Sequence, residues 1–115
     1  MEKRIKLLVY PVTDIKKAKA FYNKFLSVEP YVDSPYYVGY KVGDLEVGLD
    51  PNATAGPIGY TDVADIQASL KEMAEAGAEI VQDIKDVGNG LLIAKVKDMD
   101  GSVVGLRQHP SAISS

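Results

Sequence analysis

Val12-Thr13-Asp14-Ile15 and Val63-Ala64-Asp65-Ile66 are two copies of one short pattern, and each opens a stretch with helical spacing of apolar residues. Val47-Gly48-Leu49-Asp50 and Val104-Gly105-Leu106-Arg107 form a second such pair later in the chain. The openings lie 51 residues apart (Val12 to Val63) and the later segments 57 apart (Val47 to Val104). A repeat of this length suits one supersecondary module, and modules that cannot bury their apolar faces alone must pack together. The repeat therefore predicts two similar modules with a site between them.

Each module has the predicted order strand, helix, strand, strand, strand. Short apolar or alternating runs indicate the strands, and Gly-rich or Asn-rich stretches indicate the turns between them. The predicted strands are 5–10, 30–33, 36–42 and 45–50, then 58–63, 79–84, 91–97 and 102–108. We expect one domain, made of a module at 5–51 and a module at 57–108, joined by a linker at 52–56.

The two predicted helices begin after Asp14 and Asp65, because a carboxylate at this place accepts hydrogen bonds from free amides of the first turn. In the first helix the apolar residues recur with helical spacing, and they predict one buried face. These residues are Ile15, Ala18, Phe21, Tyr22, Phe25 and Leu26.

The composition is that of an ordinary globular domain. The chain has 115 residues, of which 46% are hydrophobic, and its net charge is −3. Nucleic-acid binding usually needs a concentrated basic surface, so this charge argues against that partner. No apolar run has membrane-spanning length, and there is no cysteine for a disulfide or thiolate metal site. We expect a cytoplasmic protein that binds neither nucleic acid nor membrane.

Three segments resemble patterns of one large family. They are Tyr10-Pro11-Val12-Thr13-Asp14-Ile15, Ala76-Gly77-Ala78-Glu79-Ile80, and Asp98-Met99-Asp100-Gly101-Ser102-Val103-Val104-Gly105-Leu106. With the duplication, they make the chain similar to the vicinal oxygen chelate superfamily of glyoxalases, bleomycin-resistance proteins and extradiol dioxygenases. The resemblance implies an α+β fold of two βαβββ modules, whose curved mixed sheets enclose a cavity. It also implies a homodimer.

Enzymes of that superfamily hold a divalent metal through side chains on the first and last strands of each module. Carried over by the resemblance, these positions are Leu7, Gly48, Ile58 and Gly105. None of these residues has a side chain that can bind a metal, since divalent cations need carboxylate, carbonyl, water or imidazole ligands. The only histidine, His109, lies near the C-terminus and is expected to be solvated. We therefore expect no metal and no other cofactor.

Other candidate ligand-binding residues surround the two glycines. Strand alternation places Glu46 on the face of Gly48, and Arg107 on the face of Gly105. The two charges either orient a polar ligand or point into solvent at a sheet edge. Four tyrosines of the first module supply flat apolar faces with one hydroxyl each, which suits a ligand cavity but also ordinary strand packing. They are Tyr31, Tyr36, Tyr37 and Tyr40, and at least two are expected to line the cavity.

The sequence favours a small-molecule binding protein that sequesters or senses a hydrophobic or aromatic ligand without a metal, like the metal-free bleomycin-resistance branch. The alternative is an enzyme of the same superfamily, a glyoxalase-like lyase, an isomerase or a dioxygenase, acting on a small metabolite. Without a metal such an enzyme would need acid–base chemistry from a carboxylate such as Glu46. No catalytic residue is assigned, and whether the protein is an enzyme stays open.

Overall fold

The computed structural model of the chain describes residues 3–54 and 56–110. The chain divides into two compact units. Among the described residues, the N-terminal unit covers 5–54 and 56–59, and the C-terminal unit covers 60–110 together with 3–4. The predicted linker at 52–56 includes Ala55, which lies outside the described residues.

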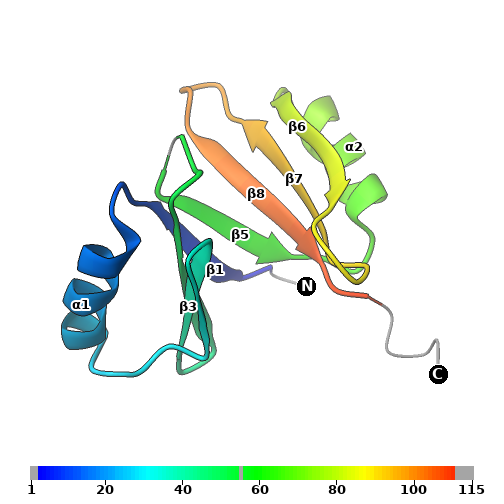
Figure 1. The fold of residues 1–115 in the computed structure, drawn as a ribbon. Helices are drawn as coiled ribbons and strands as arrows, with labels where there is room; N and C mark the ends of the chain where they lie inside the picture. Colours follow the sequence, from blue (N-terminus) through cyan, green and yellow to red (C-terminus); the bar gives the residue numbers. More distant parts are fainter. Residues whose placement is uncertain (1–2, 55, 111–115) are drawn as a thin grey trace. The chain divides into compact units, whose positions relative to one another are not determined.

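The N-terminal unit follows the predicted order strand, helix, strand, strand, strand (Figure 1). Its strands are arranged β2-β3-β4-β1, with β1 parallel to β4 and the other neighbours antiparallel. The elements are β1 (Ile5–Pro11), α1 (Ile15–Leu26), β2 (Val32–Ser34), β3 (Tyr37–Val42) and β4 (Leu45–Asp50).

The C-terminal unit repeats this arrangement as β6-β7-β8-β5, with β5 parallel to β8. The elements are β5 (Ile58–Asp62), whose first two residues end the N-terminal unit, α2 (Ile66–Glu75), β6 (Glu79–Asp86), β7 (Leu92–Lys97) and β8 (Val103–Gln108). The α+β class with two βαβββ modules is therefore confirmed. The cavity that the modules were expected to enclose stays a prediction.

Strand register confirms that the two modules correspond residue by residue. Val9 of β1 pairs with Gly48 of β4, and Tyr60 of β5 pairs with Gly105 of β8. Val9 and Tyr60 lie 51 residues apart, and the two glycines lie 57 apart, which are the spacings read from the sequence repeat. The glycines therefore occupy equivalent places in the two sheets.

Each helix begins at its predicted cap and covers one face of its own sheet. The Asp14 carboxylate accepts hydrogen bonds from the amides of Lys16 and Lys17, both at 3.1 Å. The Asp65 carboxylate accepts one from the amide of Ala68 at 3.2 Å. These bonds satisfy amides that the helices leave without an internal acceptor.

The apolar core of each unit lies between its helix and its sheet. Under α1 the buried residues are Val38, Tyr40, Val47 and Leu49. Under α2 they are Ile66, Leu70, Ala94, Val96 and Leu106. Since side chains alternate along a strand, the residues between these core positions point to the sheet face that carries no helix.

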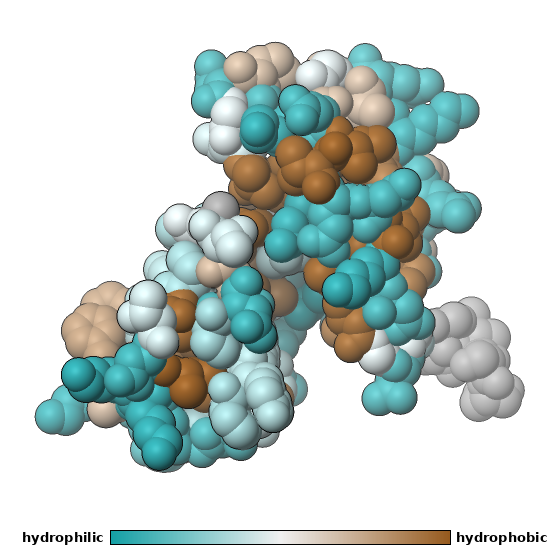
Figure 2. Space-filling model, turned by 45° about the horizontal axis from the view of Figure 1, so that its top comes forward, coloured by the Kyte–Doolittle hydropathy of each residue, from teal (hydrophilic) through white to brown (hydrophobic). Residues whose placement is uncertain are grey.

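The predicted apolar face of α1 is wrong at two positions. Phe21 and Phe25 are mostly exposed, and their rings stack on each other with centroids 5.7 Å apart. Tyr22 and Leu26 pack against the core instead, because only a stripe about one residue wide meets the sheet. Other large apolar side chains are also exposed, and Figure 2 shows hydrophobic surface (brown) interleaved with hydrophilic surface (teal).

Candidate functional site

The helix-free face of the N-terminal sheet contains half of the candidate residues that the sequence singled out. Leu7 of β1 pairs with Glu46 of β4, and Gly39 of β3 pairs with Gly48 of β4. Tyr10 and Val47 lie an odd number of residues from Leu7 and from Gly48 on the same strands, and their side chains pack in the core under α1. Leu7, Glu46 and Gly48 therefore share the face turned away from the helix.

A tyrosine ring fills the space where a side chain at position 48 would stand. A Cβ atom built on Gly48 would lie 2.0 Å from Oη and 2.6 Å from Cζ of Tyr37. Gly39 lies under the same ring, since a Cβ atom there would be 3.2 Å from Cε2 of Tyr37 and 3.3 Å from Cε1 of Tyr31. Glycine at both positions allows the rings of Tyr31 and Tyr37 to lie close against the sheet.

A polar cluster adjoins these rings. The Tyr31 hydroxyl donates a short hydrogen bond to Oε1 of Glu46. The ammonium group of Lys41, the cross-strand neighbour of Glu46, lies 4.7 Å from the centroid of the Tyr31 ring. A cation at this distance is attracted by the electron-rich ring face. The face therefore combines two aromatic rings with one anion and one cation.

The other two tyrosines do not lie on this face. Tyr40 is fully buried under α1, where its hydroxyl donates to Oδ1 of Asn23 at 2.6 Å and also lies 3.2 Å from the carbonyl oxygen of Lys19. Burial raises the pKa of Tyr40, and the negative charges of Asp33 and Glu29 raise it further. Tyr36 lies in the turn before β3 and is 74% exposed. Tyr40 is thus a core residue and Tyr36 a surface residue.

The C-terminal unit repeats the arrangement of glycine and tyrosine. A Cβ atom built on Gly105 would lie 2.3 Å from Cδ1 and 2.4 Å from Cε1 of Tyr60. Tyr60 is buried, and it shares its strand face with Ile58. In both sheets, therefore, a tyrosine ring takes the space next to the glycine of the last strand.

Arg107 lies on the same helix-free face as Gly105, but its guanidinium is held by a carboxylate. Its Nε donates to Oδ1 of Asp62 at 2.6 Å, and Nη2 donates to Oδ2 at 3.1 Å. Nε2 of His109 lies 3.2 Å from the same Oδ2. Burial alone would raise the pKa of Asp62, but the hydrogen bonds and positive charge of Arg107, with a contribution from His109, hold that pKa below its ordinary value.

The four positions that hold the metal in enzymes of the resembled superfamily do not fit a metal ion in this chain. Leu7 and Ile58 are buried apolar side chains, and tyrosine rings fill the space at Gly48 and Gly105. Within residues 3–54 and 56–110, no three His, Cys, Asp or Glu side chains are grouped so that they could hold a metal ion. The described part of the chain also has no helix long and apolar enough to cross a membrane.

Sequence reasoning missed Lys41, Tyr60 and Asp62. The signal for Tyr60 and Asp62 was available, because alternation along the strand places them on the same face as Ile58. The strand register that brings Lys41 beside Glu46 follows from the short Gly43-Asp44 turn between β3 and β4.

A family model described as Glyoxalase/Bleomycin resistance protein/Dioxygenase superfamily matches residues 4–106. With its paired βαβββ modules, the chain belongs to this superfamily. A comparison with curated proteins found no match.

Solved structures with the same fold are distant in sequence. A hypothetical protein from Bacillus halodurans C-125 superposes with a TM-score of 0.78 at 16% identity, covering 100% of both chains. A superfamily member from Vibrio splendidus 12B01 gives 0.69 at 17% identity, covering 93% of this chain and 98% of that one. A variant of methylmalonyl-CoA epimerase from Streptomyces coelicolor gives 0.74 at 14% identity, covering 96% and 100%. At these identities the similarity establishes the fold alone.

Proposed function

We propose that this protein binds a small hydrophobic or aromatic molecule on a helix-free sheet face, without a metal ion. The observation that carries this proposal is the pair of tyrosine rings at Gly48 and Gly105. In metal-dependent relatives, by the resemblance stated above, these positions hold ligands of the ion. Here aromatic surface takes their place.

The N-terminal sheet offers the better-defined ligand surface. The rings of Tyr31 and Tyr37 provide flat apolar area, and an aromatic ligand stacked on them gains both dispersion and hydrophobic burial. Glu46 and Lys41 beside Tyr31 supply one acceptor and one donor to orient a polar substituent. Arg107 lies in the C-terminal unit and is not part of this surface, and two of its nitrogens are bonded to Asp62.

A titration with 2-naphthol, a neutral planar probe, tests the proposal. We expect the amide NMR signals of Gly39 and Gly48 to shift, because these residues lie directly under the two rings. Tyr31→Leu removes a half-exposed ring and should weaken binding roughly three- to tenfold, because the interaction free energy of two stacked aromatic rings corresponds to such a change in Kd. Tyr36→Leu, which changes an exposed tyrosine in the neighbouring turn, is the matched control and should leave the affinity unchanged.

Two results would count against this binding face. One is an absence of saturable shifts at Gly39 and Gly48. The other is an equal loss of affinity in the Tyr31→Leu and Tyr36→Leu variants, which would show that the probe does not recognise the face.

The hydrogen bond between Tyr31 and Glu46 favours a second candidate, a proton-transfer enzyme in which Glu46 is the base. A carboxylate on this sheet face is the kind of group that can take a proton from a substrate as a general base. The structural similarity to methylmalonyl-CoA epimerase suggests methylmalonyl-CoA as a probe. If the protein is such an enzyme, it should catalyse exchange of the α-proton of methylmalonyl-CoA with deuterium in D2O. Glu46→Gln should abolish that exchange. The binding proposal expects no exchange above that of buffer.

We also propose a homodimer located in the cytoplasm. Exposed apolar side chains support self-association, among them Ile80, Val81 and Val104 of the C-terminal unit. Light scattering coupled to size-exclusion chromatography should give twice the mass of the 12.4 kDa chain. A mass of one chain at micromolar concentration would contradict the dimer.

A further inference from the structure

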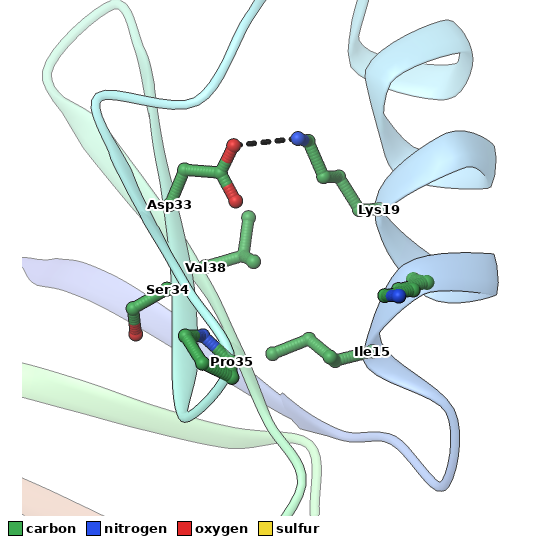
Figure 3. A pocket seen from close by; sticks show the side chains of 7 residues that line it. Ile15, Lys19, Asp33, Ser34, Pro35 and Val38 are labelled. Atoms are coloured by element: carbon green, nitrogen blue, oxygen red, sulfur yellow. Dashed lines mark hydrogen bonds and ion pairs between the residues drawn. The ribbon is translucent and has the colours of Figure 1, made fainter.

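The N-terminal unit contains a pocket of about 300 Å³ on the opposite side of its sheet from Gly48. It opens between the first turns of α1 and the β2–β3 hairpin (Figure 3). The residues lining it are Ile15, Lys16, Lys19, Asp33, Ser34, Pro35 and Val38. Asp33 and Val38 point to the helix side of the sheet, and none of these residues is among those named above on the helix-free face.

The interior of this pocket is apolar. Figure 3 shows the side chains of Ile15, Pro35 and Val38 directed into the space between helix and hairpin. Val38 is buried in the core, so it closes the bottom of the pocket. A ligand with a short hydrocarbon body would remove this apolar surface from water, which favours binding in proportion to the area covered.

The rim of the pocket is charged, with a net excess of one positive charge. Nζ of Lys19 lies 2.5 Å from Oδ2 of Asp33, and this ion pair spans the opening (Figure 3). Lys16 is exposed and makes no ion pair with any described residue. An ammonium group has three N–H donors, so Lys19 retains donors beyond the one directed at Asp33.

The remaining polar group, the Ser34 hydroxyl, is already engaged. Its oxygen accepts from the amides of Tyr36 and Tyr37 at 3.2 and 3.1 Å, and it donates to the carbonyl oxygen of Tyr37 at 3.1 Å. Ser34 therefore serves to fix the hairpin turn. Polar recognition in the pocket falls to Lys16 and Lys19.

We propose that this pocket binds a small organic monoanion, a carboxylate attached to a short apolar body. The carboxylate lies between the ammonium groups of Lys16 and Lys19, and the apolar body covers Ile15, Pro35 and Val38. A volume of about 300 Å³ is at the lower end of the range for small-molecule sites, which limits the ligand to a small molecule.

Sodium hexanoate is the probe for this site, with 1-hexanol and hexylammonium as its neutral and cationic counterparts. We expect hexanoate to shift the methyl NMR signals of Ile15 and Val38 saturably and hexylammonium to bind at least tenfold more weakly. Lys16→Gln should weaken hexanoate binding about two- to fivefold, as expected for one solvent-exposed ion pair. Asp33→Asn removes a negative charge from the rim and should strengthen binding by a similar factor.

Lys17→Gln is the matched control, because it removes the same charge from the same helix at a position that does not line the pocket. It should change hexanoate affinity less than twofold. Equal effects of Lys16→Gln and Lys17→Gln would overturn the proposal. So would equal affinities for hexanoate and hexylammonium, an unchanged affinity in Asp33→Asn, or shifts confined to residues outside the pocket.

Discussion

Replacing Gly48 with alanine tests whether the Tyr37 ring occupies the space of a side chain on β4. The added Cβ atom would stand 2.0 Å from Oη, 2.6 Å from Cζ and 2.9 Å from Cε1 of Tyr37. The closest of these distances falls roughly 1.5 Å short of ordinary van der Waals contact. The ring must therefore move away from the sheet.

The cost follows from overpacking. Extra methyl groups in well-packed sites cost about 1–3 kcal/mol, and the lower chain entropy of alanine in the unfolded state returns about 0.4–1 kcal/mol. We expect Gly48→Ala to lower the free energy of unfolding by about 1–2 kcal/mol, which lowers Tm by about 4–8 °C in a chain of this size. Gly59→Ala is the control, because its Cβ atom meets only Ile5, at 3.3 Å, and should change stability by less than about 0.5 kcal/mol.

A double-mutant cycle with Tyr37→Ala isolates the contact. Once the ring is absent, Gly48→Ala should cost nothing, so that the coupling free energy is about 1–2 kcal/mol. Urea denaturation followed by circular dichroism gives all four stabilities. If Gly48→Ala costs the same with and without the Tyr37 ring, the ring does not lie over Gly48.

Three further variants test other parts of the structure. Asp62→Asn should destabilise the protein by about 2 kcal/mol at pH 7, because it leaves the buried Arg107 without its carboxylate. Since the folded-state pKa of Asp62 lies below its ordinary value of 3.8, this stabilisation is present above that pH and is lost as pH falls through the folded-state pKa. Urea midpoints of the wild type should therefore approach those of Asp62→Asn below pH 4, and a constant difference down to pH 2 would contradict this. Tyr40→Phe removes a buried hydroxyl that donates to Asn23, and should cost about 1–2 kcal/mol in thermal unfolding, whereas no loss would mean that this bond is absent. Phe25→Ser changes an exposed ring and should cost less than about 1 kcal/mol, so a larger loss would show that the ring is buried in the protein as purified.

The sequence predicted most of the fold, because helix caps, the spacing of apolar residues and turn residues are local features of the sequence. Asp14 and Asp65 cap the helices as expected, and the predicted strand at 45–50 is observed without change as β4. Strand ends elsewhere differ by one or two residues, since they depend on which backbone groups find partners across the sheet. The two repeat spacings, 51 and 57 residues, also relate the pair Val9 and Gly48 in the first module to the pair Tyr60 and Gly105 in the second.

The candidate site was predicted only in part. Alternation could show that Tyr36 and Tyr37 point in opposite directions, but not which of them shares a face with Gly48. That choice depends on the side that α1 covers, and α1 packs over Tyr40. Phe21 and Phe25 were predicted to be buried because helical periodicity cannot show how wide a stripe the sheet covers. The pocket beside Lys16 and Lys19 had no sequence signal, since its shape arises from the approach of the β2–β3 hairpin to α1.

The most direct test of metal-free binding is a crystal structure of protein produced in medium supplemented with zinc, nickel and manganese. Anomalous diffraction should be recorded at the absorption edge of each metal. We expect the Tyr37 ring over Gly48 and the Tyr60 ring over Gly105, with no anomalous peak beside either glycine. A metal ion bound beside Gly48 or Gly105, with either ring displaced, would contradict the proposal and return the protein to the metal-dependent members of its superfamily.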